Sequence, residues 1–212
     1  MSSLGGDCSV VLGALWGLHR AGRRDVGLAY LDGHADFATP EESLTGSVAS
    51  MCLGMSVGRG ETPLARLLGD RPLVRGADVA LVGRRDEAEA WYGHAALRES
   101  GMLDLPHRRI GPAGYGGVSE RVLQRVAGAG VDGFWIHLDV DVLSPAVMPA
   151  VDSPEDGGPD LDELAPLLAA LARHPKALGM ELTIYDPELD RDRTCAARLV
   201  DLLERALGAD AC

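Results

Sequence analysis

Two short apolar runs in this sequence each end in a cluster of acidic residues. Residues 26–31 (VGLAYL) are followed at once by Asp-Gly-His-Ala-Asp, and residues 133–139 (GFWIHLD) contain His137 and lead into Val-Asp. A short apolar run that stops abruptly at polar residues is typical of a buried strand, which presents those residues at its carboxyl end. This pattern constrains the fold most, because both runs are expected inside one sheet.

Strand-like segments alternate with helical segments along the rest of the chain. We expect strands at 25–31, 78–83, 102–105, 133–139 and 178–184, and helices at 9–19, 48–57, 63–68, 87–100, 118–127, 161–173 and 193–207. The alternation predicts an α/β protein with a mainly parallel sheet flanked by helices in three layers. In such sheets ligands bind outside the carboxyl ends of the strands, where the acids lie.

The composition of the chain limits which binding partners and which cellular compartment are expected. The chain has 212 residues, 46% of them apolar, which predicts a single globular domain over 1–212. Its net charge of −12 argues against nucleic acid or an anionic membrane as a partner. We find neither a membrane-spanning run nor a secretory signal, and the four cysteines lack CxxC spacing. A cytoplasmic protein with reduced thiols is therefore expected.

The spacing of the acids suggests a metal site. In an extended segment alternate residues share one face, which would let Asp32, His34 and Asp36 converge, and likewise Asp139 and Asp141. Buried carboxylates held together repel each other, and one or two divalent cations relieve that repulsion. Carboxylates with imidazole suit Mn²⁺, with Zn²⁺, Fe²⁺ or Co²⁺ possible, and a pair of such ions activates water for hydrolysis. The alternative is a set of solvated loop acids and helix caps.

Three motifs together resemble a known family. They are Gly-Gly-Asp-Cys-Ser at 5–9, Asp-Gly-His-Ala-Asp at 32–36, and His-Leu-Asp-Val-Asp-Val-Leu-Ser-Pro at 137–145. Their order and spacing are similar to the metal-binding motifs of the ureohydrolase superfamily, which includes arginase, agmatinase and formimidoylglutamase. The resemblance continues through Gly-Arg-Arg-Asp at 83–86, Gly-Gly at 157–158 and the segment 179–187, so it covers essentially the whole chain.

The resemblance implies an activity and a set of ligands. It implies a centre of two Mn²⁺ ions whose bridging hydroxide attacks the guanidinium-type carbon of a small amidine or guanidino substrate, breaking a C–N bond. We also expect a homo-oligomer. Carried over by position, the bridging ligands are Asp32 and Asp139, those of one site are Cys8 and Asp36, and those of the other are His34 and Asp141.

Two residues of the expected centre need separate treatment, because one differs from the family pattern and the other is not among its implied ligands. Cys8 stands where the family usually has His, and it is either a thiolate ligand that shifts the metal preference or a bystander. His137 precedes Asp139 by two residues on the same strand face. It could orient a metal-bound group or shuttle a proton, or it could be a core histidine bonded to backbone. Asp36 and His137 are the candidates for a catalytic role.

The residues expected to contact the substrate differ from the family pattern more than the metal ligands do. The family's loop histidine falls at Ala49, its asparagine at Ala38, its guanidinium-binding glutamate at Ile184, and a further acid at Ala88. Glu181 lies three residues before Ile184 and is expected to face the other way. A guanidinium without a facing acid loses a partner worth about 1.5–3 kcal/mol. Plain arginine is thus not the expected substrate, and the alternative is a catalytically impaired homologue that serves as a structural or binding module.

The sequence before the first motif is short. The family has several strands ahead of its Gly-Gly-Asp turn, whereas here only residues 1–4 precede it. We therefore expect about five strands, without the N-terminal strands of the family, and a long apolar sheet edge. Such an edge is an aggregation hazard unless it is covered, either by a partner subunit or by a segment missing from this sequence.

Overall fold

A six-stranded parallel sheet forms the centre of the molecule. The computed structural model describes residues 2–60, 62–64, 71–89, 91 and 93–208. Within them the strand order is β1-β6-β5-β2-β3-β4, and every neighbouring pair is parallel. The predicted α/β class with a parallel sheet is confirmed. The strands are β1 (Ser2–Leu4), β2 (Val26–Leu31), β3 (Val79–Val82), β4 (Leu103–Leu105), β5 (Gly133–Asp139) and β6 (Ala177–Thr183).

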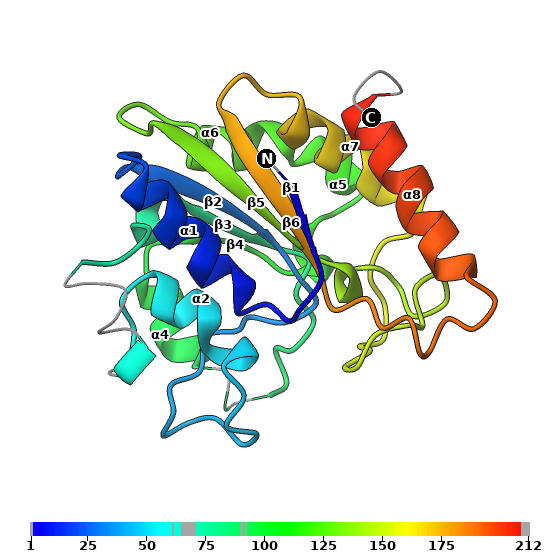
Figure 1. Ribbon diagram of the computed structural model, residues 1–212, viewed down its shortest axis with the longest axis horizontal. Coiled ribbons are helices and arrows are strands. Elements are labelled where there is room, and N and C mark those ends of the chain that lie inside the picture. The colour runs from blue at the N-terminus through cyan, green and yellow to red at the C-terminus, as the bar shows by residue number, and fades with distance from the viewer. Residues whose placement is uncertain (1, 61, 65–70, 90, 92, 209–212) are drawn as a thin grey trace.

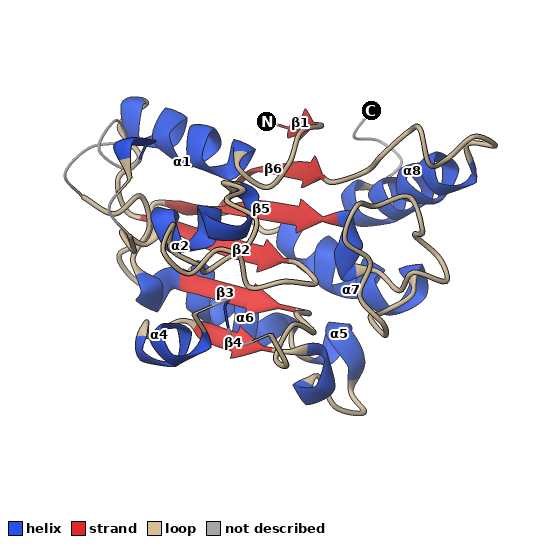
Figure 2. Cartoon of the chain, turned by 90° about the horizontal axis from the view of Figure 1, so that it is seen from below, coloured by secondary structure: helices blue, strands red, loops and turns tan. Residues whose placement is uncertain are grey.

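Helices cover both faces of this sheet (Figures 1 and 2). One face carries α1 (Val10–Arg20), α2 (Cys52–Ser56) and α4 (His94–Glu99). The other face carries α5 (Gly114–Gly117), α6 (Ser119–Val126), α7 (Leu161–Ala172) and α8 (Thr194–Leu207). Every residue of β2 and β5 is buried, as their near-continuous apolar sequences predict for strands covered on both sides. In the described part of the chain, no helix is both long enough and apolar enough to cross a membrane.

Register places the functional residues at one edge of the sheet. Tyr30 of β2 pairs with His137 of β5, so Asp32 and Asp139 follow at adjacent strand ends. His137 in turn pairs with Glu181 of β6. Close packing of β2 against α6 requires a glycine, because a Cβ at Gly27 would lie 2.0 Å from a backbone oxygen of that helix. The central strands therefore bring three separate parts of the sequence together.

Two elements differ from the sequence predictions. The strand β1 was not expected because it has only three residues, all exposed. It pairs with residues 180–182 of β6, so a short exposed strand containing two serines covers that part of the edge that was predicted to be long and apolar. The helix expected at 87–100 begins only at His94, because Gly93 has a left-handed φ of 68° and a Cβ there would lie 2.8 Å from Phe37 O. Most of the helix expected at 63–68 lies outside the described residues.

Candidate metal centre

Tight turns, rather than extended chain, bring the acids together. The strand β2 ends at Leu31, and a single 3₁₀ turn follows Asp139. Asp32 Oδ1 accepts a hydrogen bond from the backbone N–H of His34 at 2.6 Å, and Asp139 Oδ1 accepts one from Asp141 N–H at 2.8 Å. The prediction that alternate residues would share a strand face was therefore wrong in its geometry. Each leading carboxylate instead caps the turn that carries the next side chain toward it.

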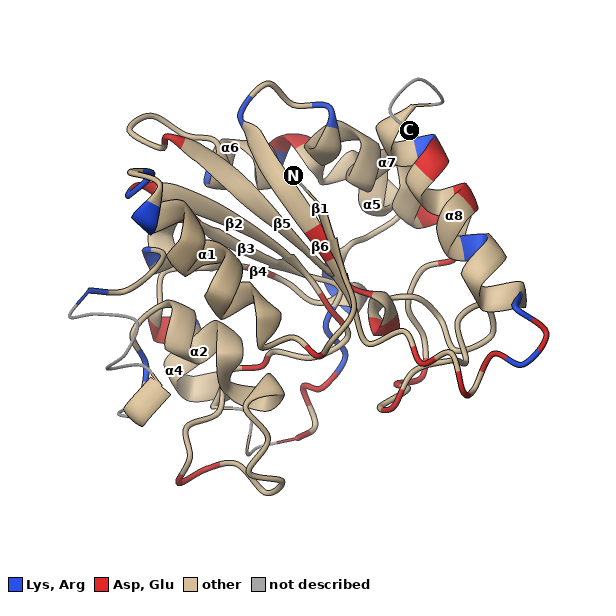
Figure 3. Ribbon diagram, viewed as in Figure 1, with Lys and Arg blue, Asp and Glu red and all other residues tan. Residues whose placement is uncertain are grey.

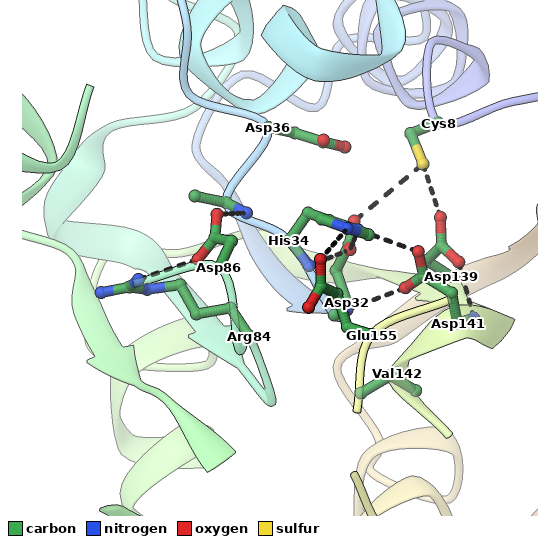
Figure 4. Close-up of polar contacts among 12 residues, drawn as sticks. Cys8, Asp32, His34, Asp36, Arg84, Asp86, Asp139, Asp141, Val142 and Glu155 are labelled. Atoms are coloured by element: carbon green, nitrogen blue, oxygen red, sulfur yellow. Dashed lines mark hydrogen bonds and ion pairs between the residues drawn. The ribbon is translucent and has the colours of Figure 1, made fainter. Parts of the chain in front are cut away.

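The first cluster contains Cys8, Asp32, His137 and Asp139, whose potential ligand atoms all lie within 4.8 Å of one another. Cys8 Sγ donates to Asp139 Oδ2 at 2.7 Å and lies 4.0 Å from Asp32 Oδ2 (Figure 4). Burial, and then the nearby carboxylates, raise the pKa of the Cys8 thiol well above its usual value. The thiol therefore keeps its proton in the ion-free protein, and a bound cation would have to displace that proton.

The second cluster contains Asp32, His34 and Asp141, so Asp32 belongs to both. His34 Nδ1 lies 2.9 Å from Asp141 Oδ2 and 3.7 Å from Asp32 Oδ1. Burial opposes a charged imidazole, but hydrogen bonds to Asp141 and Asp32 outweigh it and raise the pKa of His34 to about 12. Although Asp141 is also buried, its bond to His34 lowers its pKa. A protonated His34 thus supplies the positive charge that a cation would supply in this cluster.

Asp36 lies near these clusters but belongs to neither of them. Its Oδ2 accepts a hydrogen bond from Tyr30 Oη at 2.6 Å, and Cys52 Sγ lies 3.5 Å from the same oxygen. The backbone of Asp36 has a positive φ of 47°, which turns the chain after the motif. The resemblance implies that Asp36 and Cys8 are ligands of one site, whereas the structure places His137 in the cluster of Cys8.

His137 is fully buried on β5. Its Nδ1 lies 2.8 Å from Glu181 Oε1, and its ring stacks on Tyr30 with the centroids 4.1 Å apart. Among the described residues its Nε2 has no hydrogen-bond partner, and it lies 3.9 Å from Asp32 Oδ2. This histidine therefore forms its hydrogen bond with a carboxylate on the neighbouring strand. The interpretation of His137 as a core histidine bonded to backbone is wrong in its bonding partner.

Arg84 holds the Asp-Gly-His-Ala-Asp turn in place. Its guanidinium donates to Asp86 Oδ1 at 2.9 Å and to both oxygens of Asp104 at 2.8 and 2.7 Å. Asp86 Oδ2 then accepts from the backbone N–H of Ala35 at 2.8 Å. Because these groups are mostly buried, the ion pairs fix the backbone that positions the two clusters.

Arg85 fixes the opposite side of the centre. Its guanidinium donates to Asp141 O at 2.7 Å, to Val142 O at 2.9 Å and to Glu155 O at 3.3 Å. A Cβ at Gly158 would lie 2.7 Å from Val142 O and 2.9 Å from Arg85 Nη1, so a glycine there lets the loop approach both groups. The Arg-Arg and Gly-Gly sequences noted above therefore form one framework beneath the acids.

A cavity of about 370 Å³ opens above the clusters. Ala49 and Ile184 line it at the positions where the resemblance expects histidine and glutamate. Among its described lining residues there is no lysine or arginine. Its walls are formed by Cys8, Asp32, His34, Asp36, Thr45, Ser47, Ala49, Ser50, Glu89, Trp91, Asp139, Asp141, Asp152, Ser153, Pro154, Glu155 and Ile184. Acidic residues gather on the loops at these strand ends (Figure 3), which makes the cavity attractive to cations.

Glu89 and Trp91 are cavity residues that sequence reasoning missed. Trp91 Nε1 donates to Glu89 Oε2 at 2.7 Å, and both side chains line the cavity. The resemblance puts the family's substrate-facing acid at Ala88, and the neighbouring Glu89 was not predicted to face the cavity. Asp86 instead binds Arg84, and Glu87 lies 2.6 Å from Arg108. The loop lacks regular periodicity, so no pattern in the sequence could show which acid faces the cavity.

Known proteins with this arrangement identify the family. A model described as the Arginase family matches residues 1–208. The chain belongs to the arginase family. It is 31% identical to the arginase of Bacillus subtilis (strain 168) over 207 residues, which is 97% of this chain and 68% of that protein. It is 30% identical to the Bacillus caldovelox arginase, covering 97% of this chain and 67% of that one.

A solved arginase confirms the fold of this family member. The crystal structure of arginase from Bacillus subtilis superposes with a TM-score of 0.88 at 29% identity, over 98% of this chain and 71% of that one. The expected membership in the ureohydrolase superfamily is thereby confirmed. This arginase-family chain spans about two thirds of the relatives' length. Family membership assigns it to a family of hydrolases and leaves its substrate open.

Proposed function

We propose that this arginase-family protein is a metal-dependent hydrolase that cleaves a C–N bond in a small, linear, cationic amidine or guanidino compound. One observation carries the proposal: Asp32 belongs to two adjacent clusters of potential ligands, as a carboxylate shared by two metal ions must. The donor atoms fit divalent cations, since both clusters combine carboxylates with imidazole and are almost fully buried. Mn²⁺ is the first expectation for the ions, and two would bind.

The cavity supports a cationic substrate. Its volume suits a small molecule, and Glu89 and Glu155 add acidic groups to the carboxylates beneath. Trp91 holds one oxygen of Glu89, which orients that carboxylate toward a bound guanidinium or amidinium. Ile184 stands where the resemblance expects a glutamate. A substrate bound here would therefore lack the contact that this glutamate makes in other family members. This supports a substrate other than plain arginine.

The roles of individual residues follow from their positions. When bound, the two ions would provide a deprotonated water molecule at neutral pH and polarise the substrate. Asp32 and Asp139 are proposed to hold both ions, with His34 and Asp141 completing one site. Asp36 lines the cavity, with Tyr30 fixing one of its oxygens, and is the candidate to transfer a proton to the leaving amine.

A substrate panel tests the hydrolase. Mn²⁺-loaded protein is incubated with linear amidines and guanidino compounds, and ammonia or urea release is measured. We expect turnover of at least one compound and its loss in Asp139→Asn, while Glu204→Gln, an exposed change on α8, leaves turnover unchanged. Metal analysis by atomic emission should give two ions per chain, and less than one would rule out the proposed centre.

One observation favours a second candidate, a homologue that binds metal without hydrolysis. Ala49 and Ile184 line the cavity in place of the residues that the family uses on its substrates. In that case the ions bind normally and no compound of the panel turns over. Residues 1–212 as one domain, a homo-oligomer and a cytoplasmic location stay predictions. Size-exclusion chromatography with light scattering would test the oligomer.

A further inference from the structure

His137 has one ring nitrogen that no described residue uses. The residue is fully buried, and Nε2 has no hydrogen-bond partner. A buried polar atom without a partner destabilises the folded state, so such atoms call for a physical explanation. Asp32 Oδ2 lies 3.9 Å from Nε2, which is too long for a hydrogen bond.

Glu181 determines which way this histidine presents its lone pair. The carboxylate of Glu181 is 1% exposed and lies 2.8 Å from Nδ1, and because a carboxylate accepts a hydrogen bond we assign the ring proton to Nδ1. Nε2 then points its lone pair at the cluster of Cys8, Asp32 and Asp139. A second proton on Nε2 would find no acceptor within hydrogen-bond distance in the part of the chain that the structure describes. Histidines that bind metals characteristically donate their other ring N–H to a carboxylate in this way.

Tyr30 separates the roles of His137 and Asp36. Its ring stacks on His137 at an interplanar angle of 17°, which fixes the plane of the imidazole. Its hydroxyl donates to Asp36 Oδ2 at 2.6 Å and so holds that carboxylate outside both clusters. Tyr30 therefore fixes the ring of His137 so that Nε2 faces the cluster of Cys8, and it holds the carboxylate of Asp36 outside that cluster.

We propose that His137 Nε2 binds the metal ion on the Cys8 side of the centre directly, in the place that the resemblance gives to Asp36. The ion would then be held by one sulfur, one nitrogen and the carboxylates of Asp32 and Asp139. Thiolate and imidazole favour Zn²⁺ or Co²⁺ over Mn²⁺, whereas the cluster of His34 and Asp141 contains no sulfur. The two ions of the centre would thus differ in preference. This inference rests on the proposed metal-dependent function and names the ligands within it.

Cobalt titration tests the ligand set without relying on activity. Metal-free protein is titrated with Co²⁺, and the thiolate-to-cobalt absorption is recorded together with ions bound per chain. We expect this absorption in the wild type and its absence in Cys8→Ser. His137→Gln should weaken binding at this site by at least about tenfold, whereas Asp36→Asn should keep it within about threefold. In dialysis against equal Zn²⁺ and Mn²⁺, the wild type should retain Zn²⁺ at this site.

The outcomes separate this inference from the proposed function. Loss of the ion in Asp36→Asn, or its retention with full affinity in His137→Gln, overturns the exchange of ligands even if the protein hydrolyses an amidine. Absence of bound metal in the wild type overturns both. If His137→Gln does not fold, ¹⁵N NMR of histidine-labelled, Zn²⁺-loaded wild type decides the question. Metal-bound ring nitrogens on two histidines support the inference, and on His34 alone they overturn it.

Discussion

Neutralising Asp32 should stabilise the metal-free protein, although the same change removes a proposed metal ligand. Burial, and then the charge of Asp141, raise the pKa of Asp32 from 3.8 to about 6 in the folded state. The folded state therefore holds this proton more tightly than the unfolded chain does. Below the unfolded pKa, Asp32 is protonated in both states and its ionisation does not affect stability. Its destabilising effect grows as pH rises from the unfolded pKa to the folded pKa, and it is constant above the folded pKa.

The size of this effect follows from the pKa difference. A difference of one corresponds to about 1.36 kcal/mol, so ionised Asp32 lowers the free energy of unfolding by about 3 kcal/mol at pH 8. At pH 5 the folded carboxyl is mostly protonated, and the cost falls to about half that value. Asp32→Asn keeps an oxygen that can accept the N–H of His34, so it should recover most of this free energy.

Urea unfolding of chelator-treated protein, followed by circular dichroism, measures the change. Asp32→Asn should raise the free energy of unfolding by up to about 3 kcal/mol at pH 8 and by about half as much at pH 5. The matched change Asp141→Asn should act in the opposite direction, because it removes the partner of protonated His34. A destabilised Asp32→Asn at pH 8, or an equal gain at both values of pH, would refute the reasoning.

Added metal should reverse the order of stability. A ligand at about one hundred times its Kd stabilises the folded state by about 2.7 kcal/mol. Mn²⁺ should therefore raise the unfolding temperature of the wild type but not that of Asp32→Asn, as scanning calorimetry can show. An equal rise in both proteins would mean that Asp32 is not a ligand.

Three further changes test the framework and the thiol. Gly27→Ala should unfold or strongly destabilise the protein, since its Cβ would lie 2.0 Å from Val126 O. The control change Gly13→Ala on α1 meets nothing within 4 Å, and it should leave the unfolding temperature unchanged or raise it in the same thermal melt. Arg85→Ala should lower the unfolding temperature and weaken metal affinity by about 10–100-fold in a titration, because the loop carbonyls lose their shared donor. Arg85→Lys should recover only part of this, since a single ammonium cannot replace the planar guanidinium. Calorimetric titration in two buffers should show that metal binding releases about one proton fewer in Cys8→Ala than in the wild type, and an equal release would make Cys8 a bystander.

The sequence predicted the central part of the fold well, because burial on both faces leaves a strong signal. The runs that became β2 and β5 are apolar throughout and stop where the acids begin. The signal fails for β1, where three exposed residues pair only through their backbone. It fails again at 87–89, where residues that suit a helix instead begin with a turn, and Glu89 lines the cavity.

The sequence by itself determined which residue types reach the carboxyl edge of the sheet and in what order, since strand periodicity and motif spacing are local properties of the chain. Only the tertiary structure decided which atoms meet there. Pairing of β5 with β6 places Glu181 beside His137, and the hydroxyl of Tyr30 holds Asp36 away from Cys8. The contact between His137 and Glu181 joins residues 44 positions apart in the sequence, whereas that between Tyr30 and Asp36 spans six positions across a turn. They depend on register and side-chain rotation, so no pattern along the chain could reveal them.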